Sequence, residues 1–432
     1  MTNQVRDALI ARSITGHAPA GRPVVARSWL RAALGVAAIG WGAQEFTPLL
    51  LLYQSRLHLA PATVQATFVP YVIGLAPGLL LGGPVSDRFG RRWVVAPTVL
   101  VSALATLLML PAGGHGVGWL FLGRFMAGVA SGAGFSSGAA WIKELSTAAS
   151  PDGGNHGPRR LTIAMGVGFG LGPAVSGSLA QWAPWPTVLP YLPHLILTAV
   201  AFAAVLGTPE TLVPKASVGM LRHLRLHEVR SRRFLTVVLP LAPWVFIPVS
   251  VAVAYLPGLV KTHVGSYPLL FAAAVTVTNA AAGILVQPVA RRINHPTRPT
   301  LLASAMSLIV IGMLLAVLAL HLQWPAGIIV VSFVLGAGYG GCQVYGLLEA
   351  QRLARPDHTA GLTATYQALS YVGFAASYPL AALQQVFPAT TLLSAVAVLA
   401  LLTLLVTTRC ASSATTPVRG QAEEDVPPLA VK

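Results

Sequence analysis

The feature that most constrains this chain is a series of long apolar runs separated by short polar connections. Twelve runs of about 17 to 27 residues are each long enough to cross, as a helix, the roughly 30 Å hydrocarbon core of a bilayer. Because 55% of the residues are hydrophobic and only 9% are charged, the composition excludes an ordinary soluble domain. We therefore predict an all-α polytopic membrane protein with spans at 29–53, 63–83, 93–110, 118–142, 161–182, 187–206, 234–260, 268–289, 300–320, 325–348, 362–383 and 390–406.

The basic residues predict the orientation of these spans. Of the 28 lysines and arginines, 25 fall in the two tails and in every second connection, and only an even number of spans produces this alternation. By the positive-inside rule, these connections and both termini are cytoplasmic. The same topology accounts for the formal charge of +16, because the basic residues lie between apolar segments and not on a separate polar domain. Nucleic acid is therefore not expected as a partner.

The longest cytoplasmic connection divides the twelve spans into six and six. We predict a cytoplasmic N-terminal tail at 1–28, an N-terminal six-helix bundle at 29–206, a cytoplasmic linker at 207–233, a C-terminal six-helix bundle at 234–406 and a cytoplasmic C-terminal tail at 407–432. The halves resemble each other, since PVSDR at 84–88 matches PVARR at 288–292 and GAGF at 132–135 matches GAGY at 336–339, both at an offset of 204. Two six-helix pseudo-repeats around a central cavity are the architecture of an alternating-access transporter.

The connection after the second span reads GPVSDRFGRR, at 83–92. It resembles the loop signature G-x-L-A-D-R-x-G-R-R of the major facilitator superfamily, with Val85 and Ser86 as departures. A positive-inside anchor would also contain such arginines, but the position in this loop is specific. The second copy of the motif carries Arg291 where Asp87 maps, so its function is expected to be degenerate. The resemblance implies a cytoplasmic latch between the halves, formed by Gly83, Asp87, Arg88, Gly90 and Arg91, with Glu144 as the acid partner.

The fourth span contains LGRFMAG, whose Arg124 and Gly128 resemble the R-x-x-x-G signature of the same family. An arginine inside a membrane must face protein or water and find a partner. Arg124 lies about six residues into its helix, within reach of an interface. It is therefore either a functional residue or an anchor that snorkels to the interface.

The fifth span contains GFGLGPAVSG, at 168–177. It resembles the antiporter signature G-x-x-x-G-P-x-x-G-G, with Ser176 in place of one glycine. Within the family this pattern is associated with drug:proton exporters, so the resemblance implies the 12-helix drug:proton antiporter group. A Gly-rich face that only packs helices together would look similar. The residues of this packing motif are Gly168, Gly172, Pro173 and Gly177.

Glu45 is the acidic residue that an apolar span explains least. The other eleven acids lie in tails, in cytoplasmic connections or at the cytoplasmic end of a span, whereas Glu45 lies roughly 12 Å of helix from the outer end of the first span. The chain has no G-x-x-x-x-G-K-[ST] motif for a nucleotide, so a proton gradient is the expected energy source. We predict Glu45 and Arg124 as proton-coupling residues. Alternatively, Glu45 is hydrogen-bonded to neighbouring helices as a structural or gating residue, or it binds a cationic substrate.

Three further sets of residues could carry chemistry: the two cysteines, a serine motif together with His194, and polar or aromatic residues inside the predicted spans. No metal or cofactor is expected, because Cys342 and Cys410 are isolated from each other. The GFSSG sequence at 134–138 fits G-x-S-x-G and, with His194, resembles the Ser/His pair of an intramembrane protease, but this match is common in a Gly/Ser-rich packing helix. His194 is therefore expected to be a buried or interfacial residue. The candidates for lining a substrate cavity are Trp41, Gln44, Gln65, Asn279, Gln343, Tyr345, Tyr366 and Gln367.

These features favour a secondary active transporter and not an enzyme. We predict proton-coupled efflux of small amphiphilic compounds or drugs by alternating access, with a small-molecule substrate, protons and the lipid bilayer as partners. A proton-coupled importer of a small metabolite is an alternative, and a non-transporting membrane receptor or scaffold is another. The four lysines against 24 arginines suggest a GC-rich bacterial source, so we expect the bacterial inner membrane as the location. We also expect a monomer.

Overall fold

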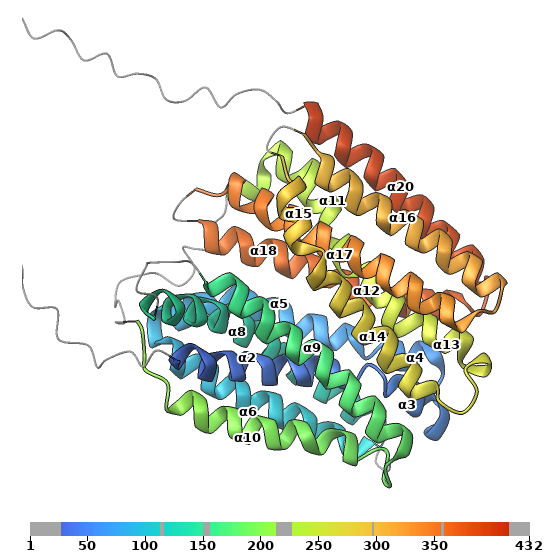
Figure 1. The fold of residues 1–432 in the computed structure, drawn as a ribbon, viewed down its shortest axis with the longest axis horizontal. Coiled ribbons are helices and arrows are strands. Elements are labelled where there is room, and N and C mark those ends of the chain that lie inside the picture. The colour runs from blue at the N-terminus through green and yellow to red at the C-terminus, as the bar shows by residue number, and fades with distance from the viewer. Residues whose placement is uncertain are drawn as a thin grey trace, which may run out of the picture. The chain divides into compact units, whose positions relative to one another are not determined.

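The computed structural model describes residues 27–112, 116–149, 156–212, 227–295, 298–355 and 358–413. Every regular element in these ranges is a helix (Figure 1). The helices form two compact units. One unit consists of the described residues of Met1–Arg225 together with Val264–Ala280, and the other consists of those of Leu226–His263 and Ala281–Lys432.

The first unit consists of eight α-helices, one short 3-10 helix and the beginning of α14. These are α2 (Ser28–Gln44), α3 (Leu50–Arg56), α4 (Pro61–Gln65), α5 (Phe68–Phe89), α6 (Arg91–Met109), α8 (Gly118–Ala148), α9 (Gly157–Trp182), η1 (Leu189–Tyr191), α10 (Leu192–Leu206) and the part of α14 (Pro268–Leu285) up to Ala280. α8 packs along α5 and α6, α2 packs along α9, and α10 lies beside α2 and α6 (Figure 1). Glycines let α5 and α8 touch along their backbones, because a Cβ at Gly128 or Gly132 would collide with a backbone carbonyl of α5.

The second unit begins with a distorted helix and ends with long regular ones. Its elements are η3 (His227–Arg230), η4 (Phe234–Val238), α11 (Leu239–Leu241), η5 (Ala242–Val245), α12 (Ile247–Ser250), η6 (Val251–Tyr255), α13 (Leu256–Val260), η7 (Lys261–His263), the end of α14, α15 (Gln287–Ile293), α16 (Thr300–His321), α17 (Pro325–Leu353), α18 (Thr359–Tyr371), η8 (Val372–Ala376), α19 (Ser377–Leu383) and α20 (Ala389–Ser413). Four prolines interrupt the hydrogen bonding between 234 and 260, which explains the changes of helix type there. α16 and α20 lie side by side (Figure 1).

All twelve predicted spans coincide with helical segments. Among the described residues, nine stretches are long and apolar enough to cross a membrane. The three predicted spans outside this set are 29–53, which is interrupted by a turn, 118–142, which lies in α8, and 362–383, which is divided into α18, η8 and α19. Glycine and serine dilute the apolar character of α8, because neither side chain adds hydrophobic surface. The first and third of these segments therefore fall outside the set because their helices are interrupted, and the second because its helix is less apolar.

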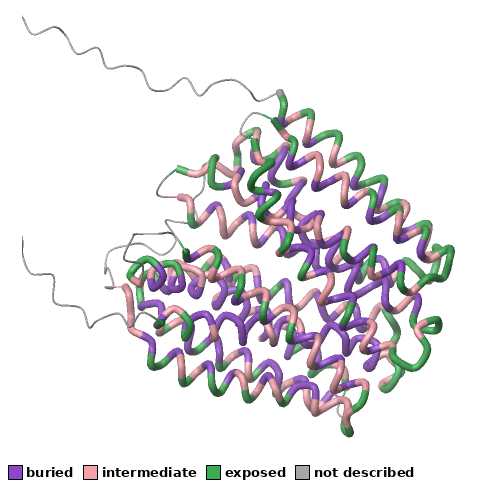
Figure 2. Tube along the Cα trace, viewed as in Figure 1, coloured by how far each residue is buried: buried purple, intermediate pink, exposed green. Residues whose placement is uncertain are grey.

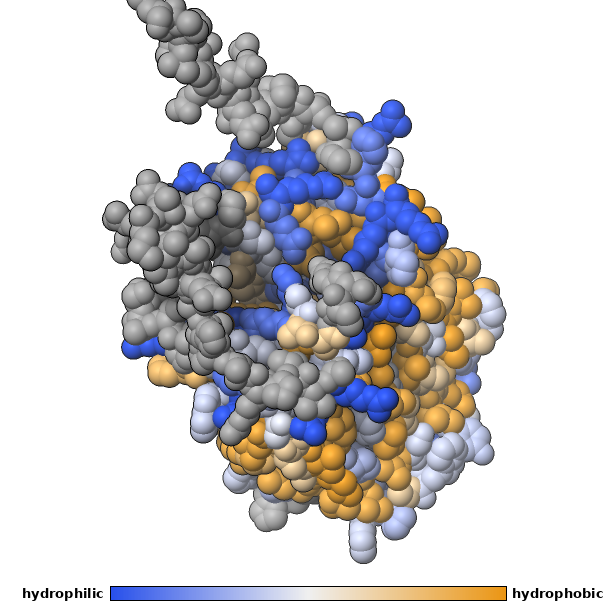
Figure 3. Space-filling model, turned by 60° about the vertical axis from the view of Figure 1, so that its left-hand side comes forward, coloured by the Kyte–Doolittle hydropathy of each residue, from blue (hydrophilic) through white to orange (hydrophobic). Residues whose placement is uncertain are grey.

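The outer faces of the helices are apolar. α20 alternates buried and exposed positions, and its exposed face carries leucines and valines between Val398 and Val406 (Figure 2). Hydrophobic residues cover much of the surface in the view of Figure 3, and hydrophilic residues gather toward its upper part. An exposed apolar helix face of this kind is unfavourable in water and suits contact with lipid chains.

Candidate functional site

A turn interrupts the first predicted span. α2 and α3 lie on either side of residues 45–49, which form turns. Pro48 lies in this segment, and proline lacks the N–H that would continue helical hydrogen bonding. The Glu45 backbone carbonyl instead accepts a hydrogen bond from the Ser176 hydroxyl of α9, at 2.7 Å. The Glu45 side chain is fully buried, so the turn places a carboxyl group inside the helix bundle of the first unit.

Three segments of the first unit meet at the Glu45 carboxyl. The Thr106 hydroxyl of α6 donates a hydrogen bond to Glu45 Oε1, at 2.8 Å. Nδ1 of His194, on α10, lies 2.7 Å from the same hydroxyl oxygen and 3.4 Å from Glu45 Oε1. None of the three side chains is more than 1% exposed, so these polar groups depend on one another for hydrogen bonds. We call Glu45, Thr106 and His194 the buried triad.

Arg124 of α8 lies near the triad without pairing to an acid. Its side chain is only 1% exposed, which does not fit an anchor that reaches the interface. Nη1 donates a hydrogen bond to the Ala43 carbonyl at 3.0 Å, and none of the ion pairs among the described residues involves Arg124. Cation–π interactions with such rings stabilise a desolvated arginine. Three ring centroids lie 4.4 to 5.4 Å from the guanidinium carbon, those of Phe46, Phe68 and Tyr71.

The remaining polar groups around the Glu45 carboxyl belong to aromatic residues. The hydroxyls of Tyr53 (α3) and Tyr191 (η1) are 2.7 Å apart, and both residues interact electrostatically with Glu45. The Trp41 indole also interacts with the Glu45 carboxyl. Within the described chain, however, neither the indole nitrogen nor Glu45 Oε2 has a partner at normal hydrogen-bond geometry. A buried carboxylate oxygen without a direct partner is costly.

The residues predicted to line a substrate cavity divide between the two units. Trp41, Gln44, Gln65 and Asn279 belong to the first unit, and Gln343, Tyr345, Tyr366 and Gln367 to the second. Gln65 and Asn279 are both buried. Gln343 of α17 donates a hydrogen bond to Gln367 of α18 at 3.2 Å. Tyr366 is also buried, and its hydroxyl donates to a backbone carbonyl of α17 at 3.1 Å, as a residue that packs two helices together would.

The connection between α5 and α6 contains an ion-pair network centred on Arg91. Nη2 of Arg91 donates to Glu144 Oε1 at 2.8 Å, and Nη1 lies 2.5 Å from Asp87 Oδ1. Nη1 also donates to the Ser86 hydroxyl at 2.6 Å. Arg88 is exposed and takes no part in this network; its guanidinium carbon lies 5.3 Å from the ring centroid of the next residue. Arg91, Asp87 and Glu144 are thus the predicted latch residues that contact one another.

Glu210, just after α10, belongs to the same network. Its two carboxyl oxygens accept the backbone N–H groups of Arg91 and Arg92, each at 2.9 Å. These donors open α6 and have no partner within the helix, and a negative charge at this end is favourable for the helix dipole. Gly90 has a φ of 104°, and a Cβ there would lie 2.7 Å from Glu210 Oε2, so both the backbone conformation and the space require glycine. Gly83, at the start of the motif, faces a hydroxyl of α8.

The glycines of the fifth predicted span pack against other helices of the first unit. A Cβ on Gly168 or Gly172 would press into a backbone carbonyl of α2, and one on Gly177 would meet α14. Pro173 lies inside α9, between these contacts. Ser176, which replaces a motif glycine, donates the hydrogen bond to the carbonyl of the α2–α3 turn. This motif therefore contacts the segment that carries the buried carboxyl.

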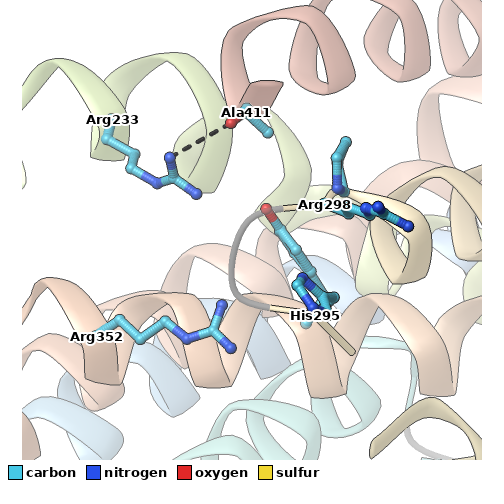
Figure 4. A pocket seen from close by; sticks show the side chains of 7 residues that line it. Arg233, His295, Arg298, Arg352 and Ala411 are labelled. Atoms are coloured by element: carbon cyan, nitrogen blue, oxygen red, sulfur yellow. Dashed lines mark hydrogen bonds between the residues drawn. The ribbon is translucent and has the colours of Figure 1, made fainter. Parts of the chain in front are cut away.

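The second unit has a buried carboxylate of its own, Glu349 of α17. It accepts a hydrogen bond from Arg233 and lies 3.5 Å from Arg352 Nη1. Arg291, which occupies the position of Asp87 in the second copy of the loop motif, is in none of the ion pairs of the described residues. Beside the Glu349 pair, side chains from several segments line a basic hollow (Figure 4). The lining residues are Arg233, His295, Arg298, Pro299, Tyr345, Arg352 and Ala411.

Several residues of these sites are absent from the predicted site residues, among them Thr106, His194 and Glu210. Thr106 and His194 come from helices whose apolar pattern does not indicate that they meet at Glu45, and Glu210 looks like an ordinary loop acid. One sequence signal was available, because a histidine in an otherwise apolar run needs a polar partner. No signal identified that partner as Thr106, which is 88 residues away along the chain.

Curated proteins similar to this chain include three named for drug resistance. The chain is 26% identical over 339 residues to a chloramphenicol resistance protein from Pseudomonas aeruginosa, covering 77% of this chain and 78% of that protein. It is 25% identical to a bicyclomycin resistance protein homolog from Haemophilus influenzae, over 40% of this chain and 42% of that protein. It is 31% identical to a puromycin resistance protein from Streptomyces alboniger, over 36% and 29%. The last two matches thus span less than half of the relatives' length.

Solved structures show the same fold at low sequence identity. A D-xylose–proton symporter aligns with a TM-score of 0.67 and 16% identity, over 87% of this chain and 95% of its own. A peptide transporter aligns with a TM-score of 0.70 and 14% identity, over 93% and 98%. The family model of the Major Facilitator Superfamily matches residues 32–378. This chain therefore belongs to the Major Facilitator Superfamily and is an all-helical membrane transporter, not an enzyme.

Proposed function

We propose that this transporter exports small amphiphilic compounds in exchange for protons, by alternating access between its two halves. The observation that carries the proposal is the fully buried Glu45 carboxyl at the turn between α2 and α3. A carboxyl that gains and loses a proton at this depth changes the charge inside the membrane, so it responds to a proton gradient. One charge crossing about 150 mV releases roughly 3.5 kcal/mol, enough for a concentration gradient of a few hundredfold.

Export is supported by two separate features. Three of the curated relatives are named for resistance to chloramphenicol, bicyclomycin and puromycin. The motif at 168–177 resembles the antiporter signature, and its Ser176 bonds to the turn that carries Glu45. A proton-coupled importer is the second candidate, because the solved neighbours include a symporter. In either case Glu45 serves the proton, a cationic substrate, or both in turn.

We also propose that the network around Arg91 is a cytoplasmic latch that closes in one state of the cycle. Its support is the convergence of Asp87, Glu144 and Glu210 on one short turn. In this proposal both termini are cytoplasmic, the predicted bundles 29–206 and 234–406 are the moving parts, and a monomer in the bacterial inner membrane suffices for transport.

Inside-out membrane vesicles test the proposed direction. Vesicles with an acidified lumen receive chloramphenicol, puromycin or ethidium, while luminal pH and compound uptake are followed together. Compound uptake coupled to proton release from the lumen, absent from vesicles without the protein, is the expected result. Uptake that occurs only in right-side-out vesicles would identify an importer. No movement of a wider set of dyes, antibiotics and metabolites in either orientation would favour a receptor or scaffold.

A further inference from the structure

We infer that the buried triad holds one shared proton, with the Thr106 hydroxyl as the relay between the Glu45 carboxyl and the His194 imidazole. Glu45 Oε1, Thr106 Oγ1 and His194 Nδ1 follow one another at 2.8 and 2.7 Å. Both separations are those of normal hydrogen bonds. This inference assigns chemical partners to Glu45, and it rests on the proposed function only where it connects the proton to transport.

The far side of the imidazole ring determines which nitrogen carries a hydrogen. Nε2 of His194 lies 3.1 Å from the Ala38 backbone carbonyl, which can only accept a hydrogen bond. Nε2 is therefore protonated. The Ser102 hydroxyl, 3.4 Å away, can accept from the same nitrogen and does not change this assignment. A neutral imidazole has one protonated nitrogen, so Nδ1 is a bare acceptor unless the ring is charged.

The two short contacts of the triad need one hydrogen each. Thr106 supplies only one, because a hydroxyl has a single hydrogen. If Glu45 is ionised and His194 is neutral, one of the two contacts brings lone pairs together. The second hydrogen therefore belongs either to a protonated Glu45 or to a doubly protonated His194. In both cases the triad holds one proton more than its fully deprotonated form.

The shared proton has two positions. In one form Glu45 is a neutral acid that donates to Thr106, and Thr106 donates to His194 Nδ1. In the other form Nδ1–H donates to Thr106, and Thr106 donates to the Glu45 carboxylate. On passing from the first form to the second, the Glu45 proton moves to Oγ1 while the original hydroxyl proton moves to Nδ1. Two O–H bonds break, one O–H and one N–H bond form, and the net charge of the triad stays zero.

Release of the shared proton changes the electrostatic interactions between Glu45 and the charged or titratable groups around the triad. The other titratable groups facing Glu45 are Arg124 from α8, Tyr53 from α3 and Tyr191 from η1. Arg124 is engaged by a backbone carbonyl and three rings and forms no ion pair with Glu45. Release of the shared proton leaves one negative charge facing this cation and removes a hydrogen bond from the triad. Because Glu45 lies in the turn at 45–49 and not inside a helix, the turn can respond without unwinding α2.

Infrared difference spectroscopy between high and low pH tests the shared proton without any substrate. The full-length protein is reconstituted in vesicles of phosphatidylethanolamine and phosphatidylglycerol. The carboxylic acid band of Glu45 is identified by its loss in Glu45→Gln, and the imidazole bands of His194 by isotope-labelled histidine and their loss in His194→Gln. We expect the Glu45 and His194 bands of the native protein to change together with a single pH midpoint.

Thr106 variants separate the relay from a structural role. Thr106→Val keeps the shape but removes the hydroxyl, so we expect the Glu45 midpoint to move by about one pH unit or more and the His194 bands to change independently. Thr106→Ser keeps the hydroxyl and should keep the native midpoint. Thr98→Val is the matched control on α6, because the Thr98 hydroxyl bonds only to the Val95 carbonyl of its own helix, at 2.7 Å.

An unchanged Glu45 midpoint in folded Thr106→Val overturns the inference, as do independent midpoints for the two groups in the native protein. Folding is monitored by size exclusion and thermal unfolding. If Thr106→Val does not fold, the same shift of the Glu45 midpoint is required of His194→Gln. If the spectra behave as expected while Glu45→Gln still transports uphill, the shared proton stands and the proposed proton coupling fails.

Discussion

The two units of this chain differ in which ionisable residues they bury. Among the described residues, the first unit buries Glu45, Arg91, Arg124 and His194, whereas Glu349 is the only buried acid or base of the second. The halves are related by an offset of 204 residues. At that offset, the positions of Glu45, Thr106, Arg124 and His194 are occupied by Val249, Val310, Ile328 and Val398. The buried cluster around Glu45 therefore has no polar counterpart at the corresponding positions of the second copy.

The two copies share glycine positions that pack helices together, although they do not share the polar residues around Glu45. Gly134 of α8 and Gly338 of α17 are related by the same offset, and a Cβ on either would press into an isoleucine of a neighbouring helix. Close packing needs small residues at fixed positions, so both copies keep them. A carboxyl buried among uncharged hydrogen-bonding partners is costly, and under the proposed function a single such site suffices for proton coupling. This contrast teaches that the repeat preserves the packing of the helices, while the candidate coupling site is confined to the first unit.

The largest expected effect is the difference between substitutions of the two buried glutamates, Glu45 and Glu349. Glu45→Gln should reduce proton-driven accumulation in inside-out vesicles to the level seen without a pH gradient, because the titratable group is lost. Glu349→Gln should lower the yield of folded protein, since removing one partner of a buried ion pair costs about 3 to 5 kcal/mol, but should keep accumulation per folded molecule. Loss of coupling in Glu349→Gln with native behaviour of Glu45→Gln would reverse the comparison.

The next effect tests whether the glycines of α9 are required for packing. Gly168→Ala should lower stability by about 1 to 3 kcal/mol, because the new Cβ collides with a carbonyl of α2. Gly170→Ala is the matched control two residues away, since nothing lies within 4 Å of its Cβ. That variant should be neutral or slightly stabilised. Thermal unfolding of the purified variants measures the difference, and equal midpoints would show that this face is not tightly packed.

A smaller effect compares the two copies of the loop motif. Asp87→Asn removes the charge that lies 2.5 Å from Arg91, and we expect turnover to slow by about three- to tenfold as the latch weakens. Stability should change by less than about 1 kcal/mol, because the Asp87 side chain is 51% exposed. Arg291→Asn, at the corresponding position of the second copy, should leave turnover unchanged. Initial rates of substrate exchange in vesicles provide the measurement.

The smallest expected effect concerns the residue that departs from the antiporter signature. Ser176→Ala removes the hydrogen bond to the Glu45 carbonyl and should cost about 1 kcal/mol of stability. Ser178→Ala, on the same helix, loses only a bond to its own helix backbone and should cost less. Differential scanning measurements on the two purified variants compare them directly. Equal losses would mean that the α2–α3 turn does not depend on α9.

Much of the fold can be predicted from the sequence because lipid leaves few options for the backbone. Apolar run length and the alternation of basic residues predict the twelve helical segments, and three motifs predict the family. The depth of Glu45 within the first span is also predictable, since only its position along the span is needed. Its contacts with Thr106 and His194 are not, because they depend on the rotation and neighbours of three helices. The same limit applies to Glu210, whose partners are backbone N–H groups more than a hundred residues away.

α6 joins the ion-pair network around Arg91 to the buried triad. It begins at Arg91, which is fixed by Glu144 and Glu210, and it carries Thr106 about 22 Å further along its axis. A helix of this length behaves as a stiff rod, so a shift that lengthens the Thr106 contacts also strains the ion pairs at its opposite end. Pro97 lies between the two points and is where the rod can bend. In the proposed mechanism, a single helix would connect protonation of the triad at one end with closure of the latch at the other.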